Sequence, residues 1–429
     1  MNNSIYKTIA TYPQITNSTF TMKIRLFFTY IFCVLFIACR LTPKDHDSTS
    51  SISISQAISQ DIDSLISELK KIQNEHVLPG FAVSIFTKDE IILEKGFGYS
   101  DVASKTPYTT ESVQMIASIT KTLIGVSLMK AAEDGQIKLD DDVNDILPFT
   151  VRNPNFPNTP ITIRQLATHT SSITSTKNSD KGYRFESPLL EEEFPKAHHP
   201  FFKHLNITNK LSMSDYLEFK LSKGGRWYEK EVYSSHEPGS FYDYSNLGAT
   251  LLAHCIALKT GQSFDDYSEE LILDRLEMNS STWHLDEVDN KNHVTYYNEI
   301  LNEVPRYSIV SYPDGGLYSS VQDLTKYLQE MMKGFDGEGN LLSANSYKEM
   351  MSGHYKDEEI TEGLCWDLSM GTDLIGHAGN DYGTATLAYF SPSSGIGRIL
   401  FTNMSLEKEE LSDAYYGIYN LLFEYDFSE

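Results

Sequence analysis

Apolar positions along the chain follow two different spacings. Between 61 and 75 they recur three and four residues apart, which predicts an amphipathic helix. The segments 81–86 and 91–99, on either side of Lys88-Asp89, are rich in β-branched and aromatic residues and predict a β-hairpin. Two further runs of this kind, at 383–390 and 397–403, predict a second pair of strands near the C-terminus.

Between these strands the spacing is helical. Helices are predicted over 118–134, 163–169, 245–260, 264–277 and 321–333, and a last one from about 407. Gly135, Gly261 and Gly334 follow three of them, as is typical of left-handed C-caps. Ser263 and Ser320 stand just before two of them and are expected to cap their first turns.

Strands at both chain ends with helices between them predict an α+β fold. We expect one antiparallel sheet of about five strands, built from both ends of the chain and flanked by helices, with a helical domain inserted between its halves. The sheet domain would take residues 61–105 and 310–429, and the helical domain residues 106–309. Within the latter, the segment 174–237 has weak periodicity and is expected to form an added lobe.

The N-terminal segment has the layout of an export signal. The first 39 residues contain no acidic residue, and Lys23 and Arg25 precede an apolar run of about 13 residues, which suits a signal core and is too short to span a bilayer. Residues 1–38 are therefore predicted to be a signal peptide. Phe36-Ile37-Ala38 before Cys39 resembles a lipobox, so a lipidated Cys39 is favoured over a plain secretory signal.

The segment 39–60 that follows is rich in serine and is expected to be a flexible tether. Export and tether together predict a protein of the bacterial cell envelope, periplasmic or anchored to the membrane only through the lipid.

The charge balance limits the partners. The chain of 429 residues carries 35 Lys+Arg and 59 Asp+Glu, with a net charge of -24. So acidic a surface repels phosphate backbones, which argues against nucleic-acid binding. The length allows about two to four folding units, and the oligomeric state stays open.

Metals and cofactors are not predicted. The four cysteines include no C-x-x-C pair and are too few for a disulfide framework. His198, His199 and His204 lie in the lobe without a carboxylate or cysteine at a recognisable ligand spacing, so a polar loop is favoured over a metal site.

Candidate chemistry begins at Ser118-Ile119-Thr120-Lys121. Residues three apart on a helix share a face, so the Lys121 ammonium can reach the Ser118 hydroxyl, and a serine needs such a neighbouring base to become a nucleophile. The S-x-x-K pattern alone is weak, since the sequence contains it five times. What distinguishes Ser118 is the order of later motifs, Tyr244-Ser245-Asn246 at a helix start and His377-Ala378-Gly379-Asn380 before the final strands.

With these motifs the chain resembles the serine β-lactamase and penicillin-binding protein superfamily. The resemblance is to the branch of class C β-lactamases, D-alanyl-D-alanine carboxypeptidases and β-lactamase-like esterases, and it covers about residues 61–425. It extends to other segments of the chain, namely Gly96-Phe97-Gly98-Tyr99, Leu166 to Ser172, Pro238-Gly239, and Gly315 to Ser320 with Asp323-Leu324.

The resemblance implies a role for each motif residue. Ser118 would be the acylated nucleophile, and Lys121 and Tyr244 would share its proton, with the lysine charge lowering the pKa of the tyrosine. Asn246 would orient the scissile group. The backbone N–H groups of Ser118 and Asn380 would bind the oxyanion, with Gly379 allowing a close approach of the backbone.

Two departures from the family pattern bear on this reading. His377 stands where many β-lactamases have lysine, and it would contact the substrate carboxylate or assist proton shuttling. A histidine that is partly charged near neutrality would hold a carboxylate weakly and with pH dependence. Ser172 replaces a glycine in the segment around His169, and His169 itself is expected to be a structural hydrogen-bonding residue.

The function expected is that of a serine hydrolase that works through a Ser118 acyl-enzyme on a small D-amino-acid peptide, a cell-wall fragment or an ester, without a cofactor. The alternatives are a weak β-lactamase and a non-catalytic envelope protein that binds peptidoglycan on the same fold.

Overall fold

The computed structural model describes residues 54–75, 78–175, 182–189, 211–371, 373–425 and 427. Residues from Ile54 onwards form one compact unit. The predicted signal peptide 1–38 and the predicted lipidation site Cys39 lie outside the described residues, as do His198, His199 and His204. The predicted division into a sheet domain, a helical domain and a lobe stays a prediction.

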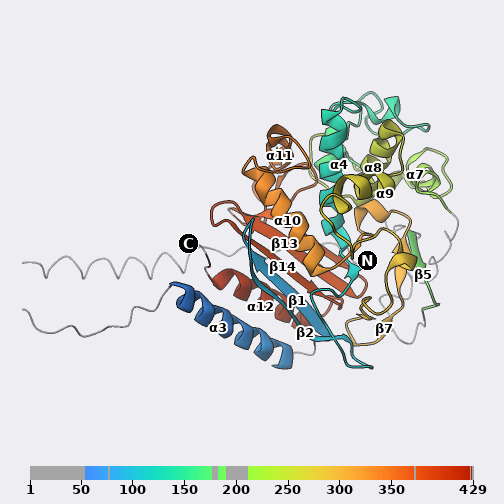
Figure 1. The fold of residues 1–429 in the computed structure, drawn as a ribbon. Helices are drawn as coiled ribbons and strands as arrows, with labels where there is room; N and C mark the ends of the chain where they lie inside the picture. Colours follow the sequence, from blue (N-terminus) through green and yellow to red (C-terminus); the bar gives the residue numbers. More distant parts are fainter. Residues whose placement is uncertain are drawn as a thin grey trace, which may run out of the picture. The chain divides into compact units, whose positions relative to one another are not determined.

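A six-stranded antiparallel sheet joins the two ends of the described chain (Figure 1). The strands are, in order across the sheet, β12 (Ile375–Asp381), β13 (Thr384–Ser391), β14 (Ile396–Thr402), β1 (Gly80–Phe86), β2 (Ile91–Asp101) and β3 (Thr106–Pro107). The N-terminal β1 pairs with the C-terminal β14, with Phe81 opposite Thr402. Both predicted strand pairs are therefore present in one sheet.

Helices cover both faces of this sheet. Side chains of β1 alternate in direction, so that Phe81, Val83 and Ile85 pack on one side against α3 (Ile54–Glu75) and α12 (Glu409–Glu424). Residues of the opposite face, such as Ala82 and Phe86, join the larger core with α10 (Val321–Phe335) and the helical part. The sheet is thus a buried middle layer, visible in Figure 1 between α12 and α10.

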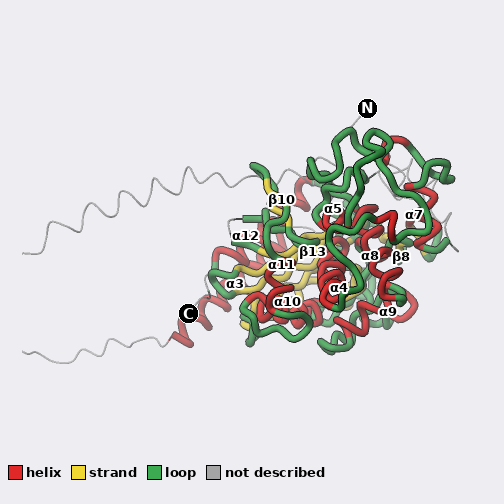
Figure 2. The backbone as a smooth tube through the Cα atoms, turned by 90° about the horizontal axis from the view of Figure 1, so that it is seen from above, coloured by secondary structure: helices red, strands yellow, loops and turns green. Residues whose placement is uncertain are grey.

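The helical part surrounds α4 (Lys121–Glu133), a helix buried on nearly every side. Packed against it are α8 (Asn246–Thr260), α9 (Phe264–Ser268) and α11 (Ala344–Met350), while α5 (Ile163–Ala167) and α7 (Met213–Leu221) pack against α8. Figure 2 shows α4, α8 and α9 beside the sheet. A helix hydrophobic all round needs such enclosure, and α4 carries the candidate site at its N-terminal end.

Four short antiparallel pairings complete the fold. They are β4 (Gln114–Met115) with β9 (Tyr318–Ser319), β5 (Tyr183–Phe185) with β8 (Tyr307–Ile309), β6 (Tyr296–Tyr297) with β7 (Glu303–Val304), and β10 (Tyr355–Lys356) with β11 (Thr361–Glu362). The β5 strand comes from the segment predicted as an added lobe.

Several boundaries differ from the sequence prediction. The sheet has six strands, in agreement with the expected number of about five, and besides the four predicted runs it contains the His377 segment as the edge strand β12 and the two-residue β3 at the opposite edge. The first helix begins at Ile54, within the predicted tether. Gly334 lies inside α10, where a Cβ would meet the Tyr347 ring at 2.3 Å, so close packing explains this glycine. The predicted helix 264–277 turns into a π-helix at Glu269–Leu273.

The caps at Ser263, Ser320 and Gly261 agree with their predictions. Ser263 and Ser320 accept hydrogen bonds from the N–H groups of Asp266 and Asp323, and Gly261 ends α8 at φ 75°.

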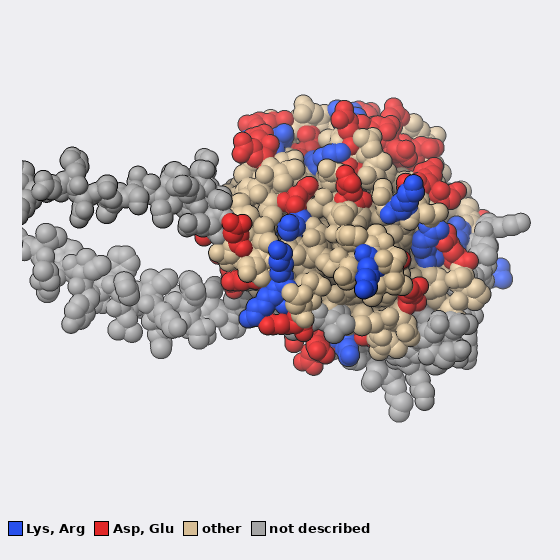
Figure 3. All heavy atoms as spheres, turned by 60° about the horizontal axis from the view of Figure 1, so that its bottom comes forward, with Lys and Arg blue, Asp and Glu red and all other residues tan. Residues whose placement is uncertain are grey.

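On the face of the molecule drawn in Figure 3, acidic side chains gather along the upper rim and basic ones lie across the middle.

Candidate active site

Ser118 lies in a tight turn that is fixed by the sheet. The turn is the 3-10 helix Ala117–Thr120, which leads directly into α4. Ala117 has φ 47°, in a region that residues other than glycine adopt at a cost. From β13, the Thr386 hydroxyl donates to the Ile116 carbonyl at 2.7 Å. The strand therefore holds the backbone from which Ser118 projects.

Lys121, the first residue of α4, points back at this serine. Residues three apart eclipse each other in a 3-10 helix, and Lys121 Nζ donates to Ser118 Oγ at 2.9 Å. It also donates to the carbonyl oxygen of Asp314, in the 3-10 helix Tyr312–Asp314. Burial lowers the pKa of Lys121 to about 8, and no ion pair of Lys121 occurs in the described part of the chain. At pH 7 roughly a tenth of such lysines are neutral and able to accept a proton.

Tyr244 lies beside this lysine at the start of α8. Lys121 Nζ stands 5.1 Å from the centre of the Tyr244 ring. Ser245 caps the helix, since its Oγ accepts from the Gly248 N–H at 2.9 Å. Asn246 is then the first helical residue, and its Oδ1 is buried without a hydrogen-bond partner among the described residues. The N-cap thus presents a phenol and a carboxamide together, as the sequence predicted.

His169 packs against Tyr244 and binds the backbone of the next residue. Its ring packs on the Tyr244 ring with centroids 4.4 Å apart, and its Nδ1 accepts from the Ser245 N–H at 3.2 Å. Burial holds the pKa of His169 well below its usual range, so the ring is neutral. This geometry fits the predicted structural role. Ser172 in the same loop adopts φ 64°, so the loop keeps a left-handed residue although the position is not glycine.

The edge strand β12 closes the other side of the site. A Cβ on Gly379 would lie 2.8 Å from the backbone N of Ser118 and 2.6 Å from the Ile116 carbonyl oxygen. Only glycine leaves room for this contact. The next residue, Asn380, is exposed. Because Gly379 contacts the Ser118 backbone, the segments that carry the two predicted oxyanion donors are neighbours.

His377, two residues before Gly379, differs from the sequence expectation in its charge. Its ring lies 6.1 Å from that of Tyr244, and its Nδ1 is 2.6 Å from the Ala378 carbonyl oxygen. Because a carbonyl only accepts, Nδ1 carries the proton and Nε2 is left as an acceptor. Burial and the nearby Lys121 charge lower the pKa of His377 to about 4. The imidazole is therefore neutral at pH 7, and the expectation of a partly charged histidine is wrong.

The sequence did not single out three carboxyl groups around Lys121, of which Asp314 and Glu362 are buried and Asp381 is half-buried. Asp314 accepts from the Thr250 hydroxyl at 2.8 Å, Glu362 is 2% exposed with Oε1 unpartnered among the described residues, and Asp381 follows Asn380. Burial raises the pKa of each, that of Asp381 to about 6. The Gly315-Gly316 turn after Asp314 was the only local sequence feature that could have pointed to one of these carboxyl groups. Their proximity to Lys121 depends on contacts between segments that are distant in the sequence.

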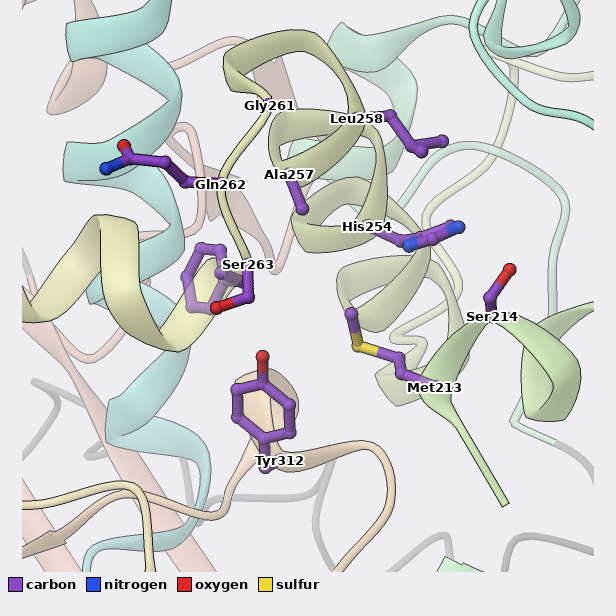
Figure 4. Close-up of a pocket in the computed structure, with 10 residues that line it drawn as sticks. Met213, Ser214, His254, Ala257, Leu258, Gly261, Gln262, Ser263 and Tyr312 are labelled. Atoms are coloured by element: carbon purple, nitrogen blue, oxygen red, sulfur yellow. The ribbon is translucent and has the colours of Figure 1, made fainter. Parts of the chain in front are cut away.

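Other features of the described residues add no second site. No group of three or more His, Cys, Asp or Glu side chains suited to a metal occurs in the described part of the chain. Within that same part, no helix is both long and apolar enough to cross a membrane. A cavity of about 490 Å³ lies among α7, α8 and Tyr312, and its lining includes none of the predicted site residues (Figure 4).

The fold and this cluster define the class of protein. A serine, a lysine and a tyrosine meet between an antiparallel sheet and a helical part, which is a β-lactamase/transpeptidase-like arrangement. The family model described as Beta-lactamase matches residues 62–420. The chain belongs to the beta-lactamase family.

Similar proteins carry varied names. Protein flp of Staphylococcus aureus (strain MRSA252) is 24% identical over 353 residues, which are 81% of this chain and 63% of that protein. The human mitochondrial serine beta-lactamase-like protein LACTB is 25% identical over 361 residues, 75% of this chain and 64% of that one. The chain thus spans less than two thirds of the length of these relatives.

Solved structures agree on the fold. The octameric penicillin-binding protein homologue from Pyrococcus abyssi has a TM-score of 0.66 at 26% identity, with 85% of this chain and 78% of that chain covered. A class C beta-lactamase has a TM-score of 0.62 at 19% identity, with 88% and 98% covered.

Proposed function

We propose that this protein is a serine hydrolase in which Ser118 is acylated by a D-amino-acid peptide, a cell-wall fragment or an ester. The observation that carries the proposal is the 2.9 Å contact between Lys121 Nζ and Ser118 Oγ, made by a lysine that is buried and has a pKa of about 8. A lysine that is partly neutral at neutral pH can take the serine proton, which an exposed lysine does poorly.

The reaction would run in two steps. Ser118 Oγ attacks the substrate carbonyl carbon, and its proton passes to the Lys121 and Tyr244 pair. The oxyanion that forms is bound by the N–H groups of Ser118 and Asn380. The leaving group takes up the proton as its bond to the carbonyl carbon breaks. Water then attacks the acyl carbon and gives a proton to the same pair, and the pair passes it to Ser118 Oγ as the bond between this oxygen and the acyl carbon breaks and the acid leaves.

Asn246 and His377 would orient the substrate. The unpartnered Oδ1 of Asn246 is an acceptor for a substrate N–H group. His377 offers a neutral Nε2 acceptor, which does not supply the positive charge of a lysine. A substrate carboxylate, which only accepts hydrogen bonds, therefore gains neither a charge nor a donor from His377, and this argues against efficient β-lactamase action.

Two serines of the same helix region make a matched test. Ser118 and Ser127 both begin an S-x-x-K pattern, and Ser127 Oγ is buried without a hydrogen-bond partner among the described residues. After incubation with a fluorophosphonate, intact-mass spectrometry should show one adduct on the wild type and on Ser127→Ala, and none on Ser118→Ala. Turnover of p-nitrophenyl esters should be lost in parallel.

The other outcomes separate the alternatives. An adduct that persists in Ser118→Ala would move the nucleophile elsewhere. No adduct and no turnover by the wild type would favour the non-catalytic peptidoglycan-binding protein. A panel of p-nitrophenyl esters, D-alanyl peptides and nitrocefin then distinguishes esterase, peptidase and β-lactamase.

We also propose that the protein works in the cell envelope. This rests on the sequence around residues 22–39 alone. The mass of the mature N-terminal peptide would show whether the chain begins at Cys39 and whether that residue carries a lipid.

A further inference from the structure

A tyrosine from the lobe segment reaches the end of the candidate oxyanion strand. In β5, Tyr183 pairs with Ile309 of β8, and its hydroxyl donates to Asp381 Oδ1 at 2.8 Å. The same carboxylate oxygen accepts from the N–H of Tyr382 at 2.8 Å. One oxygen thus ties β5 to the turn that follows β12.

The place of this contact matters because β12 is an edge strand. Among the described strands it pairs with β13 in the sheet, and on its outer side Asp367 bridges only Gly376, near its start. Asn380, which carries the predicted oxyanion donor, is the residue before Asp381. On its other side the strand lies against the nucleophile turn, where Gly379 leaves no room for a methyl group. A small movement of residues 380–382 would therefore change the position of the Asn380 N–H relative to Ser118.

The surroundings fix the Tyr183 hydroxyl in place. The Tyr183 ring lies 5.5 Å from those of Tyr307 and Tyr382, edge-on to the latter. The Tyr307 hydroxyl in turn donates to the Tyr382 carbonyl at 3.0 Å. Such aromatic packing restricts both tyrosines, so the hydrogen bond to Asp381 has a defined direction.

We propose that Tyr183 is a positioning residue that holds the Asn380 N–H in place for the oxyanion, acting through the Asp381 carboxylate. The inference rests on the proposed acyl-enzyme function. Tyr183 touches no reacting atom in it, so its loss should lower the rate of the chemical step and leave substrate binding almost unchanged.

The charge state of Asp381 sets the conditions of the test. The groups that face it are Tyr183 from β5, Tyr307 from β8, the following Tyr382, Asp314, Lys121 from α4, and Glu407. Burial raises the pKa of Asp381 to about 6, while the hydrogen bond from Tyr183 opposes that rise. Assays at pH 8.5 keep the carboxylate ionised and hydrogen-bonded.

Tyr183→Phe removes the hydroxyl and leaves the ring. With a p-nitrophenyl ester at pH 8.5, we expect kcat to fall about tenfold with KM within about twofold, a part of the 10²- to 10³-fold loss typical of removing an oxyanion donor. Tyr347→Phe is the matched control, because Tyr347 donates to the buried Glu330 at 2.6 Å between α11 and α10. It should lose similar stability and keep its kcat.

A second pair of variants tests the acceptor and remains informative if Tyr183→Phe does not fold. Asp381→Asn keeps an oxygen for both donors and should retain kcat within about threefold. Asp381→Ala leaves Tyr183 and the Tyr382 N–H without that acceptor and should lose at least tenfold. A folded Asp381→Asn that loses as much as Asp381→Ala would overturn the proposal, because charge rather than position would then be responsible.

The remaining outcomes separate this inference from the function on which it rests. Ser118→Ala with full activity would refute the acyl-enzyme itself. Ser118-dependent turnover with an unchanged kcat in folded Tyr183→Phe would overturn the positioning role alone. A raised KM at constant kcat would also overturn it, since Tyr183 would then contact the substrate.

Discussion

Gly379→Ala is the sharpest test of the contact between β12 and the nucleophile turn. The added Cβ would lie 2.6 Å from the Ile116 carbonyl oxygen and from Thr386 Oγ1, and 2.8 Å from the Ser118 nitrogen. Two of these three atoms belong to the backbone, so no side-chain rotation relieves them. Ordinary contact begins at 3.4 Å, and β12 would have to move by about 0.8 Å to reach it.

A shift of this size should act on catalysis more than on folding. Misplacement by about 1 Å can cost roughly 10²-fold in rate, so we expect kcat for ester hydrolysis to fall by about 10²-fold. The overpacked strand should also lose about 1–3 kcal/mol in the free energy of unfolding.

The assay compares the variant with Gly417→Ala. Gly417 lies in α12, where the nearest atom to an added Cβ, Ile72 Cδ1, is 4.0 Å away. Alanine should be accepted there and stabilise the helix by up to about 1 kcal/mol. Thermal unfolding measures stability, and fluorophosphonate titration gives the fraction of reactive Ser118, so that kcat is expressed per folded active site.

A folded Gly379→Ala with kcat within threefold of the wild type would refute the reasoning. It would mean either that β12 yields without moving the Asn380 N–H or that this group binds no oxyanion.

Two further predictions concern stability. Burial lowers the pKa of Lys121 from 10.5 to about 8, so the folded state binds this proton less tightly and wild-type stability should rise between these pH values. Lys121→Met lacks that rise. In chemical unfolding, its free energy of unfolding relative to the wild type should therefore drop by about 2 kcal/mol from pH 7 to pH 10. If the difference in unfolding free energy between the two proteins were independent of pH, burial would not be the cause of the lowered pKa. Gly334→Ala would place a Cβ 2.3 Å from the Tyr347 ring and should destabilise the protein by about 1–3 kcal/mol without changing kcat per folded molecule, whereas equal melting temperatures for it and Gly417→Ala would show that α11 yields.

Local sequence determined much of this protein. The spacing of Ser118 and Lys121, the caps at Ser263 and Ser320, and the two strand pairs all follow from neighbours within a few residues, and the structure contains each of them. Periodicity and capping act over one or two turns, so they can be read without knowledge of the rest of the fold. The family pattern added the order of the Tyr244 and His377 motifs.

Distant contacts decided the rest. The segment Ile375–Asp381 contains two glycines and few β-formers, and it is a strand because it pairs with β13. Gly334 was predicted to follow a helix, but it lies inside α10. A glycine is needed there because the Tyr347 ring, from α11, packs against its backbone.

Contacts between distant segments also determined the charge of His377 and the hydrogen bond to Asp381. His377 is neutral because the chain buries it near Lys121, and Tyr183 reaches Asp381 across 198 residues of sequence. Burial and the distances between charges set these properties, and both exist only once segments far apart in the chain are packed together. The sequence alone therefore indicated the motif side chains of the candidate site, while tertiary packing decided their charge, the carboxyl groups around Lys121 and the contact from Tyr183.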